Sequence, residues 1–223
     1  MPTMQRPGRT AAPAPLDMIQ DLLNSRSLES PIDELCSPAA LAQWYSQAGL
    51  GPRDMTIGRD DLRRAIAVRE GLRALVLGHA GALPDIALVD ALDAVAATVR
   101  LQVSFGVIGG LQPASRRSAD IALGWLLIVV EDARSDGRWA RLKGCREPTC
   151  RWVYYDTSKN RSGRWCSMSL CGTSNKQRAM VERRRAGEEG KRRQATGATS
   201  SRRPTARSPV SPARAALPPY TTM

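Results

Sequence analysis

Four cysteines in the C-terminal half are the residues whose spacing points most clearly to chemistry. They form two pairs, each with four residues between its members, and fifteen residues separate the pairs. Each pair can present two thiolates from one tight turn, which fits the ligand spacing of a zinc site. Four thiolates complete a tetrahedron and leave no position for water, so the ion would be structural and not catalytic. The sequence therefore predicts one structural Zn²⁺ held by Cys145, Cys150, Cys166 and Cys171.

Two other interpretations of these cysteines are disulfides and small buried apolar side chains. Disulfides occur mainly in exported proteins, and the first eighteen residues contain no apolar run typical of an export signal. We therefore expect a cytoplasmic protein, in which reduced cysteine pairs more often bind metal. Four of the five cysteines fall within twenty-seven residues, which argues against simple core packing. Cys36 stands apart and is expected to be an ordinary core or surface thiol.

The segments around the cysteines must bring the two pairs together. Residues 151–156 have strand composition, residues 157–163 suit a turn, and residues 164–166 would return as a second strand. A helix is expected to begin near Cys171 and to continue over residues 172–185. A hairpin and a helix around four cysteines resemble a treble-clef finger. Metal binding would supply most of the folding free energy of so small a module, on the order of 10 kcal/mol.

The aromatic side chains of this segment could stack on nucleic-acid bases. In so small a module we expect them to pack around the cysteines instead. They are Trp152, Tyr154, Tyr155 and Trp165.

The helix after the last cysteine carries a concentration of positive charge. Residues 1–140 contain 14 Lys and Arg against 16 Asp and Glu, whereas residues 141–223 contain 19 against 5, so the net charge of +12 comes from the C-terminal part. This asymmetry indicates an anionic partner, with nucleic acid the first candidate. A solvated helix whose charges only maintain solubility is the alternative. The candidates for contact with DNA phosphates are Lys176, Arg178, Arg183, Arg184 and Arg185.

Beyond the cysteines, the finger segment resembles a known family. Its aromatic strand ends in Asp156 and Ser158, a Trp-Cys-Ser-Met run covers residues 165–168, and Cys171-Gly172 precedes the basic helix. This combination resembles the CGNR-type zinc finger of bacterial proteins whose N-terminal part is called the ABATE domain. The sequence departs from the name-giving motif, because Thr173-Ser174 stand where Asn-Arg is expected.

The N-terminal part resembles the ABATE domain more weakly. The similarity rests on Asn24, on residues 31–35 leading to Leu41 and Trp44, and on the helical stretch 67–75. Both regions together cover most of residues 16–186. The resemblance implies a stress-induced regulator of transcription that binds zinc and contacts DNA through its finger.

Hydrophobic periodicity predicts a mainly helical chain. Only 4% of the residues are aromatic, so aliphatic side chains must fill the interior, which favours packed helices. Helices are expected over 16–24, from Pro38 to just before Gly49, over 59–80, from Pro84 onward and over 119–134, with a short hairpin within 101–113. The expected organisation is a disordered leader (1–15), a helical ABATE-like domain (16–140), a CGNR-type zinc finger (141–186) and a disordered basic tail (187–223).

These features bear on three classes of function. A DNA-binding regulator would sense a small-molecule effector, or self-associate, through its helical domain. An adaptor would use the finger as a zinc clip to bind protein or RNA without sequence-specific DNA binding. An enzyme is not expected, because the chain has one histidine, His79, and no recognisable nucleophile or phosphate motif. The longest apolar run, in residues 121–130, is too short to span a membrane.

Overall fold

A computed structural model describes residues 9–27, 29, 31–106 and 109–198 of the chain. The chain divides into two compact units, one ending at Gln177 and the other starting at Arg178. Residues 1–8 and 199–223, which belong to the leader and tail predicted to be disordered, lie outside the described residues.

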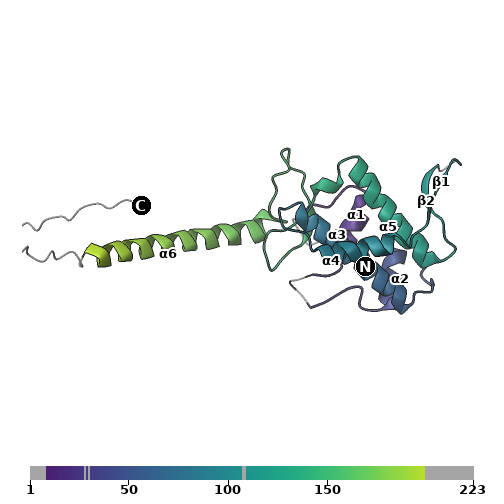
Figure 1. The fold of residues 1–223 in the computed structure, drawn as a ribbon, viewed down its shortest axis with the longest axis horizontal. Helices are drawn as coiled ribbons and strands as arrows, with labels where there is room; N and C mark the ends of the chain where they lie inside the picture. Colours follow the sequence, from purple (N-terminus) through teal and green to yellow (C-terminus); the bar gives the residue numbers. More distant parts are fainter. Residues whose placement is uncertain (1–8, 28, 30, 107–108, 199–223) are drawn as a thin grey trace, which may run out of the picture. The chain divides into compact units, whose positions relative to one another are not determined.

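The first unit is built mainly from helices, which confirms the predicted fold class (Figure 1). Ser37 caps the second helix by accepting a hydrogen bond from the Ala40 amide, so this helix begins at Pro38 as predicted. The fourth helix starts after Asp85, whose carboxylate accepts from the amides of Ala87 and Leu88, so Pro84 precedes the cap. The helices are α1 (Leu16–Asn24), α2 (Pro38–Gln47), α3 (Arg59–Gly78), α4 (Ile86–Ala96) and α5 (Ser118–Ser135).

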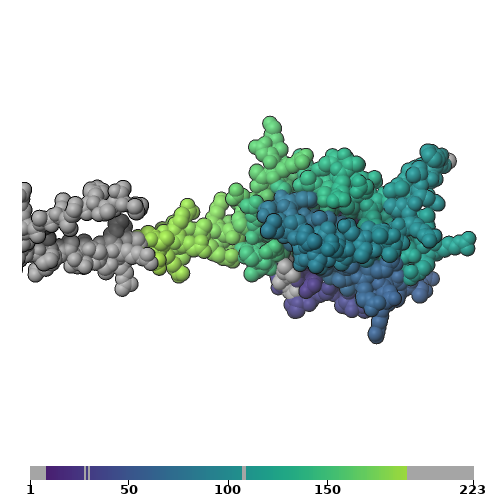
Figure 2. Space-filling model, viewed as in Figure 1, coloured from purple at the N-terminus to yellow at the C-terminus, as the bar shows by residue number. Residues whose placement is uncertain are grey.

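The main hydrophobic core lies between α1, α3 and α5. Leu16 and Ile19 of α1, Val68 of α3 and Leu123 of α5 are all fully buried in it. By contrast, α4 is apolar in sequence but buries only Leu92, and it lies at the surface on the face seen in Figure 2. It packs so closely on α3 that a side chain at Gly71 would collide with Leu92.

Two small antiparallel sheets accompany the helices. The predicted hairpin is present, with β1 (Leu101–Ser104) paired to β2 (Gly110–Pro113), and it packs on α5, where Gly124 lies against Pro113. The second sheet pairs β3 (Leu142–Gly144) with β4 (Val153–Tyr155). A short 3₁₀ turn, Trp139–Arg141, leads into β3.

The pairing of the second sheet corrects the predicted finger hairpin. Residues 164–166 were expected to form the strand opposite 151–156, but they form no strand, and β3 takes that place. Gly144 allows the pairing, because β3 lies so close to α3 that a side chain there would collide with Leu77. Contact with the helical core therefore selects the partner strand, and the local sequence alone does not reveal it.

Both predicted disordered segments are ordered where the structure describes them. Residues 9–15 pack on the first unit, with Ala12 buried and its amide donating to the Gln20 side chain. Helix α6 (Thr173–Ala198) continues twelve residues beyond the predicted end of the finger at 186. Its residues from Arg178 to Glu189 are exposed and rich in Arg, Glu and Ala, which are good helix formers. A solvent-exposed helix needs no apolar stripe, which is why the absence of apolar periodicity misled the prediction.

Candidate metal centre and basic helix

The structure brings the four predicted cysteines together into one buried cluster. Their sulfur atoms all lie within 4.8 Å of one another. Cys145 follows β3 directly, and Cys150 closes a turn in which its amide donates to the Glu147 carbonyl. Cys171 belongs to a short π-helical turn, Met168–Gly172, in which its amide donates to the Ser167 carbonyl. The remaining sulfur, of Cys166, comes from the segment just before that turn.

The spacing of the sulfurs matches a metal-bound tetrahedron and excludes disulfides. The Sγ atom of Cys166 lies 3.7 Å from that of Cys150 and 3.7 Å from that of Cys171. A zinc–sulfur bond of about 2.3 Å gives a tetrahedron whose edge is about 3.8 Å. A disulfide requires about 2.05 Å, and all five cysteines are free. The arrangement therefore fits one structural zinc ion, as the cysteine spacing predicted.

The thiols of the cluster influence one another's ionisation. Hydrogen bonds from the thiols of Cys150 and Cys166 lower the pKa of Cys145 to about 2. The same pairing with Cys145, together with burial, raises the pKa of Cys166 to about 12. One thiolate thus suppresses ionisation of its neighbour. A bound dication would remove this conflict, because each thiolate could then donate an electron pair to the metal.

Aromatic side chains enclose the cluster. Trp152 and Tyr154 are buried against the cysteines, and Trp165 packs on them from the edge. Tyr155 instead packs on the main core. The predicted packing around the cysteines is therefore confirmed for three of the rings and wrong for Tyr155. The three rings surround the sulfurs with apolar groups that limit access of water.

A buried ion pair organises the loop between β4 and Cys166. Lys143 donates to a carboxylate oxygen of Asp156 at 2.7 Å, and the amides of Ser158 and Gly163 donate to the same carboxylate. Burial by itself raises the pKa of Asp156, but these hydrogen bonds outweigh it and hold the pKa at about 2. The loop also requires glycine at 163, because a side chain there would lie within 2.9 Å of the carboxylate. Asp156 therefore fixes the path of the chain toward the second cysteine pair.

Arg9 is a residue of the centre that sequence reasoning missed. Its side chain is only 4% exposed. Its Nη2 lies 3.7 Å from the Sγ of Cys150, and its guanidinium carbon lies 4.6 Å from the centroid of the Trp152 ring. No local pattern could reveal this contact, because 141 residues separate Arg9 from Cys150 along the chain.

The five basic residues predicted to contact DNA all lie on α6 and are all exposed. Lys176 belongs to the first unit, and the four arginines belong to the second. Within the second unit, Arg178 and Arg185 are seven residues apart and share one side of the helix. Arg183 lies roughly on the opposite side, and its Nε donates back to the Ala179 carbonyl at 3.0 Å. The helix therefore presents positive charge on more than one side.

Comparison with known families agrees with this geometry. The CGNR zinc finger model matches residues 141–184, which contain the whole cysteine cluster. The ABATE model, described as "Putative stress-induced transcription regulator", matches residues 16–133, more than half of the chain. The protein belongs to the ABATE family. A search of curated proteins gave no match. Neither matched family is a family of enzymes.

The structure shows what the two residues that replace the CGNR motif's Asn-Arg do in this ABATE protein. The Thr173 hydroxyl donates to the Met168 carbonyl and the Ser174 hydroxyl donates to the Leu170 carbonyl, each at 2.9 Å. Both therefore bond to the turn that contains the last cysteine. The next residue, Asn175, donates to Glu147 at 2.7 Å and links this turn to the first cysteine pair.

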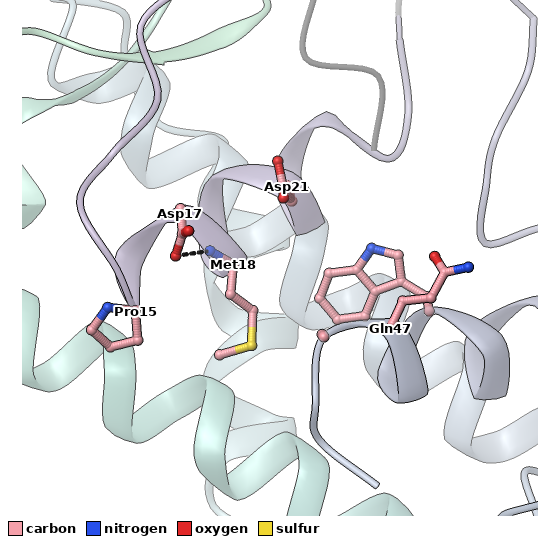
Figure 3. Close-up of a pocket in the computed structure, with 7 residues that line it drawn as sticks. Pro15, Asp17, Met18, Asp21 and Gln47 are labelled. Carbon is pink, nitrogen blue, oxygen red and sulfur yellow. Dashed lines mark hydrogen bonds between the residues drawn. The ribbon is translucent and has the colours of Figure 1, made fainter. Parts of the chain in front are cut away.

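The ABATE domain also contains cavities away from the cysteines. One of about 340 Å³ lies between α1 and α2 and is lined by Asp17, Met18, Asp21 and Gln47, among others (Figure 3). Another of about 470 Å³ lies among α3, α4, α5 and the β1–β2 hairpin, with mainly Leu and Val side chains in its wall. Among the described residues, no helix is both long and apolar enough to cross a bilayer.

Proposed function

We propose that this protein is a zinc-dependent transcriptional regulator that binds DNA through its finger and basic helix. Its zinc ligands are Cys145, Cys150, Cys166 and Cys171, and its phosphate contacts come from Lys176, Arg178, Arg183, Arg184 and Arg185. One observation carries the proposal: buried sulfurs at tetrahedral spacing come directly before a helix of exposed basic side chains. The zinc holds the start of that helix, so metal binding would also order the residues that meet the nucleic acid. Such a regulator acts in the cytoplasm, where thiols stay reduced.

The distribution of arginines favours a groove over a flat phosphate surface. An α-helix fits the major groove of B-DNA, where the phosphates of both strands line its two sides. Arg178 and Arg185 on one side of α6 and Arg183 on the other would each meet a different strand. Arg184, which projects between them, would face the base edges or one wall of the groove. These contacts are the kind that neutralise phosphate and release counterions.

The helical domain supplies what a regulator needs besides DNA contact. The larger cavity is mainly apolar, with Asp93, Glu131 and Arg134 in its wall, and cavities of this kind bind small molecules. We assign the effector to this cavity. Self-association would use the exposed apolar side chains of Ile86, Val103 and Phe105 on α4 and the hairpin, and size-exclusion chromatography with light scattering tests it.

The deciding experiment combines metal analysis with DNA titration. The purified protein is expected to hold one zinc per chain, and Cys166→Ser is expected to lose it together with the structure of the finger. Binding to a labelled duplex, measured at several salt concentrations, is expected to weaken steeply as salt rises.

A matched pair of variants tests the phosphate contacts. Replacing Arg178, Arg183, Arg184 and Arg185 with Ala is expected to reduce the slope of log K against log [salt] by about 2 to 4. The control replaces four exposed arginines of the helical domain, Arg53, Arg59, Arg100 and Arg116, and removes the same charge. Equal slopes in the two variants, or zinc-loaded protein without salt-dependent duplex binding, would favour the adaptor function instead.

A further inference from the structure

The leader segment, residues 9–15, forms hydrogen bonds with both helix α1 and strand β4 of the first unit. The Tyr155 amide at the end of β4 donates to the Thr10 carbonyl at 3.1 Å. From α1, the Gln20 side chain accepts from the Ala12 amide at 2.6 Å and donates to the Thr10 carbonyl at 3.1 Å. Both family matches start after this segment. The hydrogen bonds place Arg9 beside the cysteine cluster.

The buried guanidinium of Arg9 is only partly satisfied by the protein. Its Nη2 has the Cys150 sulfur at 3.7 Å and the Glu29 carboxylate at 3.7 Å. Its Nε and Nη1 are buried without a hydrogen-bond partner among the described residues. Burying a cation is costly unless an anion lies nearby, and Glu29 is itself 31% exposed. A further negative charge near Arg9 would offset this cost.

A zinc ion bound by four thiolates supplies that charge. The ion brings +2 and the four thiolates bring −4, so the loaded centre carries a net charge of −2 in a buried setting. Such a centre is stabilised by N–H donors and positive charge around its sulfurs, because partners outside the ligand shell tune metal affinity. Arg9 offers both at Cys150, and the Trp152 ring lies against the guanidinium in a cation–π contact.

We propose that Arg9 is a positioning residue of the zinc centre: it donates a hydrogen bond to the Cys150 thiolate and balances the negative charge of the loaded cluster. The metal centre of the finger is thus completed by the opposite end of the chain. This inference rests on the proposed zinc site.

The test compares the zinc affinity of substitutions at Arg9 by competition with a chelating dye under reducing conditions. Arg9→Met keeps apolar bulk against Trp152 but removes the charge and the donors, and it is expected to weaken zinc binding by about tenfold or more. Arg9→Lys restores the charge and is expected to recover part of the loss. Arg53→Met, at an exposed arginine, is the matched control and is expected to leave the affinity unchanged.

Two further readouts separate charge balance from packing. Loading with Co²⁺ gives a thiolate-to-metal absorption band, which is expected to shift in Arg9→Met because the Cys150 sulfur loses its donor. In the zinc-loaded protein, the cysteines of Arg9→Met are expected to react faster with an alkylating reagent. Circular dichroism of the loaded variants checks that the fold is retained. If Arg9→Met does not fold, the thiolate-to-metal band of Co²⁺-loaded Arg9→Lys, compared with that of wild type, still tests whether Arg9 acts on the Cys150 sulfur.

The outcomes distinguish this inference from the proposed function. Wild-type protein without stoichiometric zinc overturns both. Wild-type protein with one zinc, together with an Arg9→Met affinity within twofold of it, overturns the role of Arg9 alone. Equal losses in Arg9→Lys and Arg9→Met would show that charge is not what Arg9 contributes.

Discussion

The side-chain amide of Asn24 makes two hydrogen bonds to the backbone of Val153, accepting from its amide at 2.9 Å and donating to its carbonyl at 2.8 Å. Asn24 ends α1 and Val153 begins β4, so the pair joins the helical domain to the finger. Val153 and Leu142, one from each strand of the finger sheet, are fully buried in the main core. The two regions that the sequence divided at residue 140 therefore pack together within one compact unit.

Removing this pair is expected to destabilise the whole first unit. Asn24→Ala leaves the buried amide and carbonyl of Val153 with fewer partners, which costs about 2 kcal/mol of the free energy of unfolding. Urea unfolding of the zinc-loaded protein measures the loss. Asn160→Ala, at an exposed position, is the control and should change the free energy by less than about 0.5 kcal/mol. An Asn24→Ala midpoint equal to that of the control would contradict the prediction.

The ion pair between Lys143 and Asp156 makes a pH-dependent prediction. The pKa of Asp156 is held at about 2, below the value of 3.8 expected in the unfolded chain. Its contribution to stability is therefore complete above about pH 4 and is lost as the pH falls toward 2. Lys143→Ala leaves the carboxylate buried without its cation and is expected to cost about 3 to 5 kcal/mol at neutral pH.

The measurement for this pair is thermal unfolding as a function of pH. Asp156→Asn is expected to reduce the acid-dependent part of the curve below pH 4. Because it also leaves Lys143 buried without an anion, it should be destabilised at pH 7 as well. A Lys143→Ala variant as stable as wild type at pH 7 would show that the loop does not depend on the pair.

A second buried ion pair lies in the helical domain. Arg69 is fully buried, and its Nη1 and Nη2 donate to the two carboxylate oxygens of Asp33 at 2.6 and 2.7 Å. Arg69→Ala is expected to destabilise the unit by about 3 kcal/mol. The control is Arg63→Ala, which removes an exposed ion pair to Asp60 and should cost less than about 1 kcal/mol. Urea midpoints that shift equally in the two variants would rule out a special role for the buried pair.

The contact between Arg69 and Asp33 illustrates which parts of the fold could be predicted from the sequence and which could not. The predicted helices and the first hairpin are present because each is specified by nearby residues, such as Ser37 before Pro38. The clustering of the cysteines was readable for the same reason. The role of Arg69 could not be predicted from the residues near it, because its partner Asp33 lies 36 residues away. Two other features were missed for the same reason. Arg9 contacts Cys150 across 141 residues of chain, and the pairing of β3 with β4 depends on the contact of Gly144 with Leu77 of α3.

Asp21 in the cavity of Figure 3 makes stability fall as the pH rises. Burial, with the nearby charges of Asp17 and Glu34, raises the pKa of Asp21 to about 6. The unfolded chain loses this proton near pH 3.8 and the folded chain only near pH 6, so the free energy of unfolding decreases over that range. Asp21→Asn is therefore expected to be more stable than wild type at pH 7, by about 1 kcal/mol after allowance for solvent at a half-buried group.

Chemical unfolding of both proteins between pH 3 and 8 tests this prediction. The two curves should meet below about pH 4, where Asp21 is protonated in both folded and unfolded wild-type protein. Asp54→Asn, at an exposed carboxyl, should follow the wild-type curve throughout. A constant difference between Asp21→Asn and wild type at every pH would point to a cause other than ionisation.

The hydrogen bonds of Asn24 with Val153 span 129 residues of chain, and this separation determines when the protein can finish folding. During synthesis α1 leaves the ribosome long before its partner strand exists, so the core around Leu16 and Ile19 stays incomplete until residues 142–153 arrive. Cys145 and Cys150 lie between β3 and β4, so a metal could order this segment only late in synthesis, after the second cysteine pair has also been made. A cell short of zinc would thus accumulate chains whose helical part is also unfinished, exposed to proteases and chaperones.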